Sequence, residues 1–196
     1  MFLATSKPST FKSCTEARLA PVDVRHAPLF CFALLVTASA LASFVLACAT
    51  PFAAFAVIAA AMLPLQSALL VVAGAWLVNQ GIGFGVLHYP IDATTIAWGF
   101  VIGAAALAAT LAAAFALQAL RTTRATLVLP VALIAAYVAY ELTLLAATPV
   151  LGGTAAFTVD IVARLGLTSI GWSIGLAAIC EIVRLIIVMH RNRQRS

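Results

Sequence analysis

The stretch PLFCFALLVTASALASFVLACATPFAAFAVIAAAMLPLQSALLVVAGAWLVNQGIGFGVL, residues 28–87, contains no acidic or basic side chain. A transmembrane helix needs about 20 consecutive apolar residues, whereas the core helix of a soluble protein needs far fewer. The whole chain is 64% hydrophobic and only 9% charged, with a mean hydropathy of +1.13. These values predict an all-α fold, a polytopic helical bundle embedded in a membrane.

The number of spans depends on how residues 28–87 are divided. Thr50-Pro51 offers a helix start, and Leu63-Pro64 disfavours helix before the proline, so we expect three helices there, at 28–47, 50–63 and 64–87. The later spans are expected at 94–120, 125–147 and 167–190. The second span would rise only about 21 Å, against about 30 Å of hydrocarbon. It is therefore predicted to be short, a half-helix or a re-entrant element.

The positive charges favour six spans over five. With five spans the eleven basic residues would divide almost evenly between the two sides of the membrane. With six, both termini and the Arg121–Arg124 turn are cytoplasmic, and only Arg164 lies outside. We expect a disordered basic cytoplasmic tail at 1–27, a transmembrane domain at 28–190 and a second basic tail at 191–196. This placement also argues against nucleic-acid binding, despite the net charge of +5.

Signatures of catalysis, metal binding and nucleotide binding are missing. The four cysteines, Cys14, Cys31, Cys48 and Cys180, have no ligand-like spacing and are expected to be packing residues. The chain has no His-Glu-x-x-His motif, no nucleophile with a plausible base and no paired aspartates, so we expect no enzyme activity, metal or cofactor. The glycine cluster at 81–85 lacks the lysine of a phosphate-binding loop.

A few polar residues enter the predicted membrane region. Asn79 and Gln80 lie in the third span, and Glu141 lies in the fifth, one turn after Tyr137. Leaving such a group unpaired in hydrocarbon costs on the order of a few kcal/mol, as the transfer of an amide from water does. Such groups therefore form interhelical hydrogen bonds or line a binding site. We expect Asn79, Gln80 and Glu141 to line one outward-facing cavity that binds a small solute, with Tyr137 beside it. The residues His88 and Asp92, at the outer boundary, are either further ligands or ordinary loop residues.

Pairs of small residues four apart predict close helix contacts. Such pairs occur in the third, fourth and sixth spans: Gly81 and Gly85, Gly99 and Gly103, Gly171 and Gly175. In the first span, Ala38 and Ala42 give a face that could meet another helix or another membrane protein. Residues 154–165, with Asp160 and Arg164 on one side, predict a short amphipathic helix on the outer surface.

In size, in six spans with both ends inside, and in the alanine face of the first helix, the chain resembles the substrate-binding S components of energy-coupling-factor vitamin transporters. That resemblance implies a separate ATPase module as partner. We therefore expect an integral inner-membrane protein that transports a small molecule, or the substrate-binding subunit of such a transporter. The alternative is a non-catalytic structural or assembly subunit of a larger membrane complex.

Overall fold

The computed structural model describes residues 19, 21–23, 25–46, 50–120 and 125–194. These residues form six α-helices and one turn of 3-10 helix, and no strand. In chain order they are α1 (Ala27–Leu46), α2 (Phe52–Met62), α3 (Leu65–Gly85), α4 (Ala93–Ala119), α5 (Ala125–Leu151), η1 (Thr154–Ala156) and α6 (Val159–Arg193). The expected helical bundle is confirmed, while residues 1–18 and the Arg121–Arg124 turn lie outside the described part.

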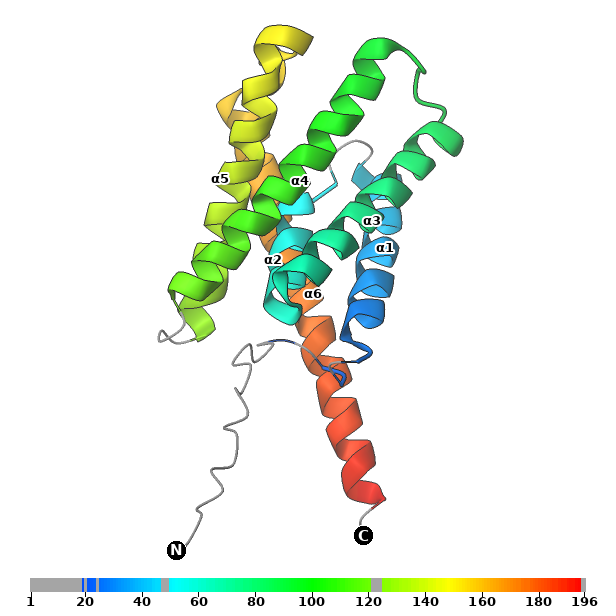
Figure 1. Ribbon diagram of the computed structural model, residues 1–196, viewed down its shortest axis with the longest axis vertical. Helices are drawn as coiled ribbons and strands as arrows, with labels where there is room; N and C mark the ends of the chain where they lie inside the picture. Colours follow the sequence, from blue (N-terminus) through cyan, green and yellow to red (C-terminus); the bar gives the residue numbers. More distant parts are fainter. Residues whose placement is uncertain (1–18, 20, 24, 47–49, 121–124, 195–196) are drawn as a thin grey trace, which may run out of the picture.

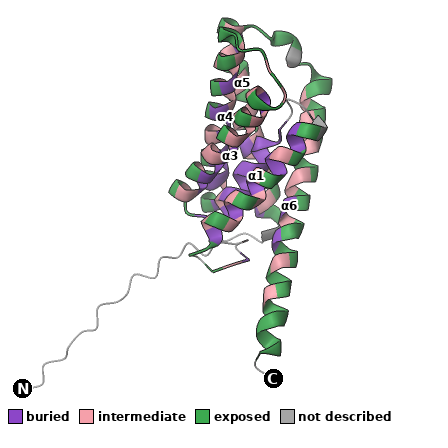
Figure 2. Ribbon diagram, turned by 90° about the vertical axis from the view of Figure 1, so that its right-hand side faces the viewer, coloured by how far each residue is buried: buried purple, intermediate pink, exposed green. Residues whose placement is uncertain are grey.

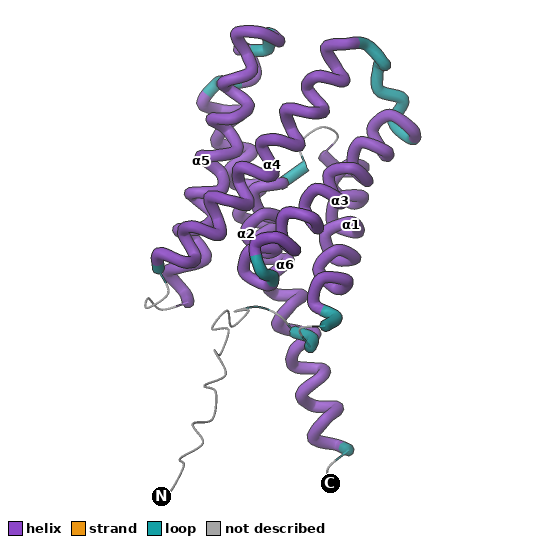
Figure 3. The backbone as a smooth tube through the Cα atoms, in the orientation of Figure 1, coloured by secondary structure: helices purple, strands orange, loops and turns teal. Residues whose placement is uncertain are grey.

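Successive helices run in alternating directions (Figures 1 and 3). The start of α1 and the end of α6 lie at one end of the bundle, drawn at the bottom of Figure 1. The α3–α4 and α5–α6 connections lie at the other end. Alternation from the first helix to the sixth is the arrangement that the six-segment prediction requires.

Five of the helices are long and apolar enough to cross a membrane, and α2 is the exception. Prolines bound α2 on both sides: Pro51 precedes its first turn, and Leu63 is extended because Pro64 follows it. The helix has eleven residues, of which all but Ala60 are buried. It contacts all five other α-helices. The short second element is thus confirmed, and it is enclosed by protein.

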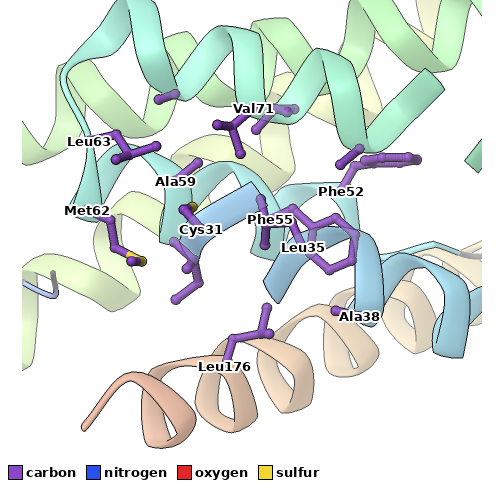
Figure 4. Packing of buried hydrophobic residues seen from close by; sticks show 14 of the residues in the cluster. Cys31, Leu35, Ala38, Phe52, Phe55, Ala59, Met62, Leu63, Val71 and Leu176 are labelled. Atoms are coloured by element: carbon purple, nitrogen blue, oxygen red, sulfur yellow. The ribbon is translucent and has the colours of Figure 1, made fainter. Parts of the chain in front are cut away.

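The apolar core has two parts that meet at α2. The first joins α1, α2, α3 and α6 through large side chains such as Leu35, Phe55 and Leu176 (Figure 4). The second joins α2, α4 and α5 mainly through alanines, including Ala109, Ala113, Ala132 and Ala136. Small side chains on facing helices let the backbones approach closely, so α4 packs extensively along α5.

The outer surface is also apolar, as a lipid-facing surface must be. Large exposed side chains include Leu70, Phe100, Phe115, Ile134 and Ile174, all on spanning helices. Helix α6 is the least covered, and its C-terminal part extends beyond the rest of the bundle (Figures 1 and 2). A water-soluble protein does not expose this much contiguous apolar surface. The chain is a multi-pass membrane protein.

Of the expectations about the helix surfaces, one is decided between its alternatives and one is wrong. Ala38 and Ala42 are 4% and 0% exposed, so their face meets other helices of the chain's own bundle rather than another protein. Residues 154–165 do not form a separate amphipathic helix. Only Thr154–Ala156 form a 3-10 turn, and the remainder from Val159 is the first part of α6. The helix continues through Gly166 because a single glycine lowers helix stability without ending it.

Candidate functional site

A cavity of about 260 Å³ lies between the start of α2, the middle of α5 and the α5–α6 connection. We name it the Glu141 cavity. Its aromatic lining comes from four separate segments: Phe52 of α2, Trp98 of α4, Tyr137 and Tyr140 of α5, and Phe157 just before α6. Its lining residues with polar side-chain oxygens are Thr50, Ser169, Glu141, Tyr137 and Tyr140.

Glu141 is the unusual member of this cavity. Its Oε1 atom is buried and has no hydrogen-bond partner in the described part of the chain. The neighbouring Tyr137 hydroxyl has a single proton and donates it to the Val162 carbonyl oxygen, 2.5 Å away, which ties α5 to α6. A buried polar group without a partner costs free energy. The carboxylate is therefore the group in the cavity with unused capacity to bind.

The α5–α6 connection forms the end wall of this cavity. Gly152 and Gly153 have φ angles of 77° and 91°, in the left-handed region that favours glycine. A Cβ atom on Gly153 would lie 3.4 Å from Trp98 Cζ2, so this turn packs closely on the indole ring. The turn brings Phe157 to the cavity and starts α6 beside α5, with Thr158 as the N-cap.

A second cavity, of about 240 Å³, lies between α1, α3 and α4. Asn79 and Gln80 line it together with Ser43, Tyr89 and Thr95. Trp98 and Ile102 of α4 line both cavities and separate them. The expected single cavity around Asn79, Gln80 and Glu141 is therefore two smaller ones, because α4 passes between α3 and α5.

Asn79 has a structural role. Its side-chain nitrogen donates to Ser43 Oγ at 2.8 Å and to Thr50 Oγ1 at 3.0 Å. The Ser43 hydroxyl in turn donates to the Ser39 carbonyl oxygen, so its oxygen is free to accept from Asn79. The amide thus connects α3 to α1 and to the segment that leads into α2. This matches the interhelical hydrogen-bonding alternative rather than a ligand site.

The predicted glycine contacts occur in α4 only. A Cβ atom on Gly99 would lie 2.9 Å from Gln80 Oε1, and one on Gly103 would lie 2.7 Å from Trp76 Cε2. Trp76 Nε1 also donates to the Gly99 carbonyl oxygen at 2.9 Å. By contrast, a Cβ atom on the other four of the six predicted glycines would meet no atom within 4 Å, so the expected contacts are wrong within the described part of the chain at Gly81, Gly85, Gly171 and Gly175.

His88 and Asp92 line neither of the two cavities. His88 has a φ of 54° in the α3–α4 connection. Asp92 is the N-cap of α4: it accepts a hydrogen bond from the Thr95 backbone N–H at 2.9 Å and one from the Thr95 hydroxyl at 2.7 Å. These bonds, the backbone one foremost, lower the pKa of Asp92. Both residues therefore fit the loop alternative.

Several residues of the two cavities were not predicted from the sequence to line a site. Ser43, Thr50 and Ser169 are hydroxyl residues inside apolar runs, and Thr50 was noted only as a helix start. Each of the three is a polar side chain within or at the end of a predicted span. The same property identified Asn79 as a candidate. Phe157 was expected on the apolar side of the amphipathic segment 154–165 and not at a cavity, because its place depends on the turn at Gly152 and Gly153.

The described residues contain no group of three or more His, Cys, Asp or Glu side chains able to hold a metal ion. Cys31 and Cys180 are free and buried in the core. No protein-family model matches the chain, and no curated protein or solved structure matches it either.

Proposed function

We propose that the protein is a small-molecule transporter of the cell inner membrane, or the solute-binding membrane subunit of one, and that its solute occupies the Glu141 cavity. The observation that carries the proposal is that Glu141, a residue lining an aromatic cavity, has a buried Oε1 atom without a hydrogen-bond partner in the described part of the chain. Ionisable residues at membrane depth usually face a bundle interior and serve an ion or substrate path.

The size of the cavity restricts the solute. Sites for drug-sized ligands usually have volumes of about 300–1,000 Å³. At about 260 Å³, the Glu141 cavity accommodates a molecule smaller than a typical drug. Rings from four segments give it an apolar wall, and Glu141 gives it one strongly polar point. Such a site fits a small amphipathic molecule.

The proposal includes an orientation in which the N-terminal end of α1 and the C-terminal end of α6 face the cytoplasm. The alternating helices leave these two ends on one side (Figure 1), and the basic residues His190, Arg191 and Arg193 lie in the last turn of α6. An alkaline-phosphatase fusion at the C-terminus should be inactive. An active fusion would place this end outside and reverse the orientation.

An ATPase partner receives less support than the solute site. The resemblance to S components rested partly on an alanine face on the first helix, and Ala38 and Ala42 are buried within this chain. The resemblance now depends on size and helix number. We therefore propose transport without assigning its energy source.

The proposal can be tested without knowing the solute. Cells producing the wild type, Glu141→Gln or Glu181→Gln would be compared by untargeted mass spectrometry of cell contents and medium. Glu181 is the matched control, because it is an exposed carboxylate that pairs with Arg184 on the same helix. We expect the distribution of one small molecule between cells and medium to change when the cells produce the wild type or Glu181→Gln. Production of Glu141→Gln should leave that distribution unchanged. Identical profiles for all three proteins would overturn the proposal.

An assembly subunit is the second candidate, and one observation favours it. An open groove of about 420 Å³ runs along α6, where Gly171 and Gly175 leave space beside Trp172 and Leu176. Exposed glycines four apart allow a helix of another membrane protein to approach closely. If assembly is the function, Gly175→Leu should abolish it while Glu141→Gln leaves it intact. A transporter acting through Glu141 should show the reverse.

A further inference from the structure

We infer that the Glu141 cavity takes a small organic cation, such as a primary amine with an aromatic or other apolar group. This inference rests on the proposed function and names the chemical class of its solute. It depends on three features of the cavity: the charge of its lining, the aromatic side chains around it and the position of the carboxylate.

The charge on the described cavity lining is negative. Among the described residues that line the cavity, Glu141 is the only acidic one and none is Lys, Arg or His. Arg164 comes directly before the lining residue Leu165, but its own side chain is exposed. The described lining therefore supplies no cation to pair with the carboxylate. An anionic solute would meet a like charge there, and a cationic one would meet its counter-charge.

The aromatic lining suits an organic cation. Five ring-bearing side chains line about 260 Å³: Phe52, Trp98, Tyr137, Tyr140 and Phe157. The ring quadrupole attracts ammonium groups, and this attraction increases where water is excluded. The same rings also bury the apolar part of the molecule. A hydrated inorganic ion would gain little from these rings, whereas an amphipathic amine uses both the rings and the carboxylate.

The unpartnered carboxylate oxygen completes the site. Glu141 Oε1 is buried and has no hydrogen-bond donor in the described part of the chain. Tyr137, one helical turn before Glu141, donates its hydroxyl proton to the Val162 carbonyl oxygen instead. An ammonium group offers up to three donors. One that bound here would supply both the missing hydrogen bond and the missing positive charge. A neutral alcohol would supply only the former.

The test uses three probes that share a ring and differ in charge: benzylammonium, benzyl alcohol and benzoate. Binding to the full-length protein in lipid nanodiscs would be measured by titration calorimetry, with empty nanodiscs as the blank. We expect benzylammonium to bind wild type more tightly than the other two. Glu141→Gln should weaken its binding by at least about tenfold, since close buried charge pairs contribute 1.4 kcal/mol or more, roughly a factor of ten. Glu181→Gln should leave it unchanged.

A second variant tests the rings. Phe157→Leu keeps an apolar side chain outside the regular helices and removes one ring. It should weaken benzylammonium binding by several-fold and benzyl alcohol binding by less. Equal losses for both probes would mean that this ring contributes apolar contact only.

The outcomes separate this inference from the proposed function. If benzyl alcohol or benzoate binds as tightly as benzylammonium, and Glu141→Gln abolishes that binding, the cavity is a solute site and the cation inference is wrong. If none of the three probes binds the folded wild type, both the inference and the proposed solute site are overturned.

Discussion

The two sides of α4 differ in how closely they are packed. Toward α3, Gly99 and Gly103 bring the backbone of α4 against Gln80 and Trp76, and a hydrogen bond from Trp76 holds the contact. Toward α6 and the α5–α6 connection, Trp98 and Ile102 border a cavity of about 260 Å³ that contains a carboxylate oxygen without a partner. The same helix thus borders a closely packed contact and an open site.

The difference shows how one can distinguish structural from functional polarity in a membrane protein. Asn79 and Glu141 both carry a cost in hydrocarbon. Asn79 offsets its cost with two hydrogen bonds to other segments of the chain. Glu141 leaves one oxygen unsatisfied. The first arrangement stabilises the bundle, and the second leaves binding capacity for a molecule from outside it.

Gly103→Leu should have the largest effect on stability. A Cβ atom alone would lie 2.7 Å from the Trp76 ring, and the ring is held by its bond to Gly99. Overpacking of this kind costs about 3 kcal/mol at the upper end of the usual range. The free energy of unfolding would be measured in detergent. Gly175→Leu is the matched control, because its Cβ meets open space, and it should change stability little. Equal losses of stability in Gly103→Leu and Gly175→Leu would contradict the close packing of α4 against α3.

Asn79→Leu should cost about 2 kcal/mol, since it removes two hydrogen bonds and leaves Ser43 and Thr50 without their donor. The neighbouring Gln80→Leu should cost less, because no such network depends on it. The same unfolding measurement would compare the two variants. A loss in Gln80→Leu equal to or larger than that in Asn79→Leu would contradict the structural role of Asn79.

Glu141→Gln should lower the free energy of unfolding by less than Asn79→Leu does, since glutamine keeps the size and shape of the side chain and the Oε1 atom has no hydrogen bond to lose. The variant should instead lose solute binding. Thermal unfolding in detergent would check the first part. A loss of stability comparable to that of Asn79→Leu would show that Glu141 is also a structural residue.

Asp92→Ala removes the side-chain N-cap of α4, and its effect on stability should depend on pH. Because the Thr95 N–H and hydroxyl lower the pKa of Asp92, its ionised form is favoured in the folded state. This contribution is fully present above the pKa of the unfolded chain and is lost as the pH falls through the lower folded value. The difference in melting temperature between wild type and Asp92→Ala should therefore be constant near neutral pH and shrink in acid. A difference that grows in acid would contradict this role.

The sequence predicted the helices well because their signals are local. The prolines at 51 and 64 place the ends of α2, and long apolar runs define the five spans. The start of α6 was wrong because the amphipathic spacing of residues 159–165 does not reveal whether the helix stops at Gly166. That outcome depends on packing against α5, where Tyr137 binds the Val162 carbonyl.

The candidate site was less predictable, since a sequence gives the depth of a residue in the membrane and not the direction it faces. Asn79 and Glu141 were expected at one cavity because they share a depth and because leaving such groups unpaired in hydrocarbon is costly. In the structure, Trp98 and Ile102 of α4 lie between their two cavities. The same limit applies to the glycine pairs, of which the pair in α4 alone faces a neighbour.

The enclosure of α2 has a consequence for biogenesis. Eleven residues rise only about 16 Å, roughly half the thickness of the hydrocarbon core. Such a segment cannot be held across the bilayer by its own length. Four of the five helices that enclose it are synthesised after it, and three of these, α4, α5 and α6, come after α3. The first third of the chain therefore completes its structure only when the last third has been inserted. A chain that stops after α3 should remain exposed to membrane proteases rather than persist as a folded intermediate.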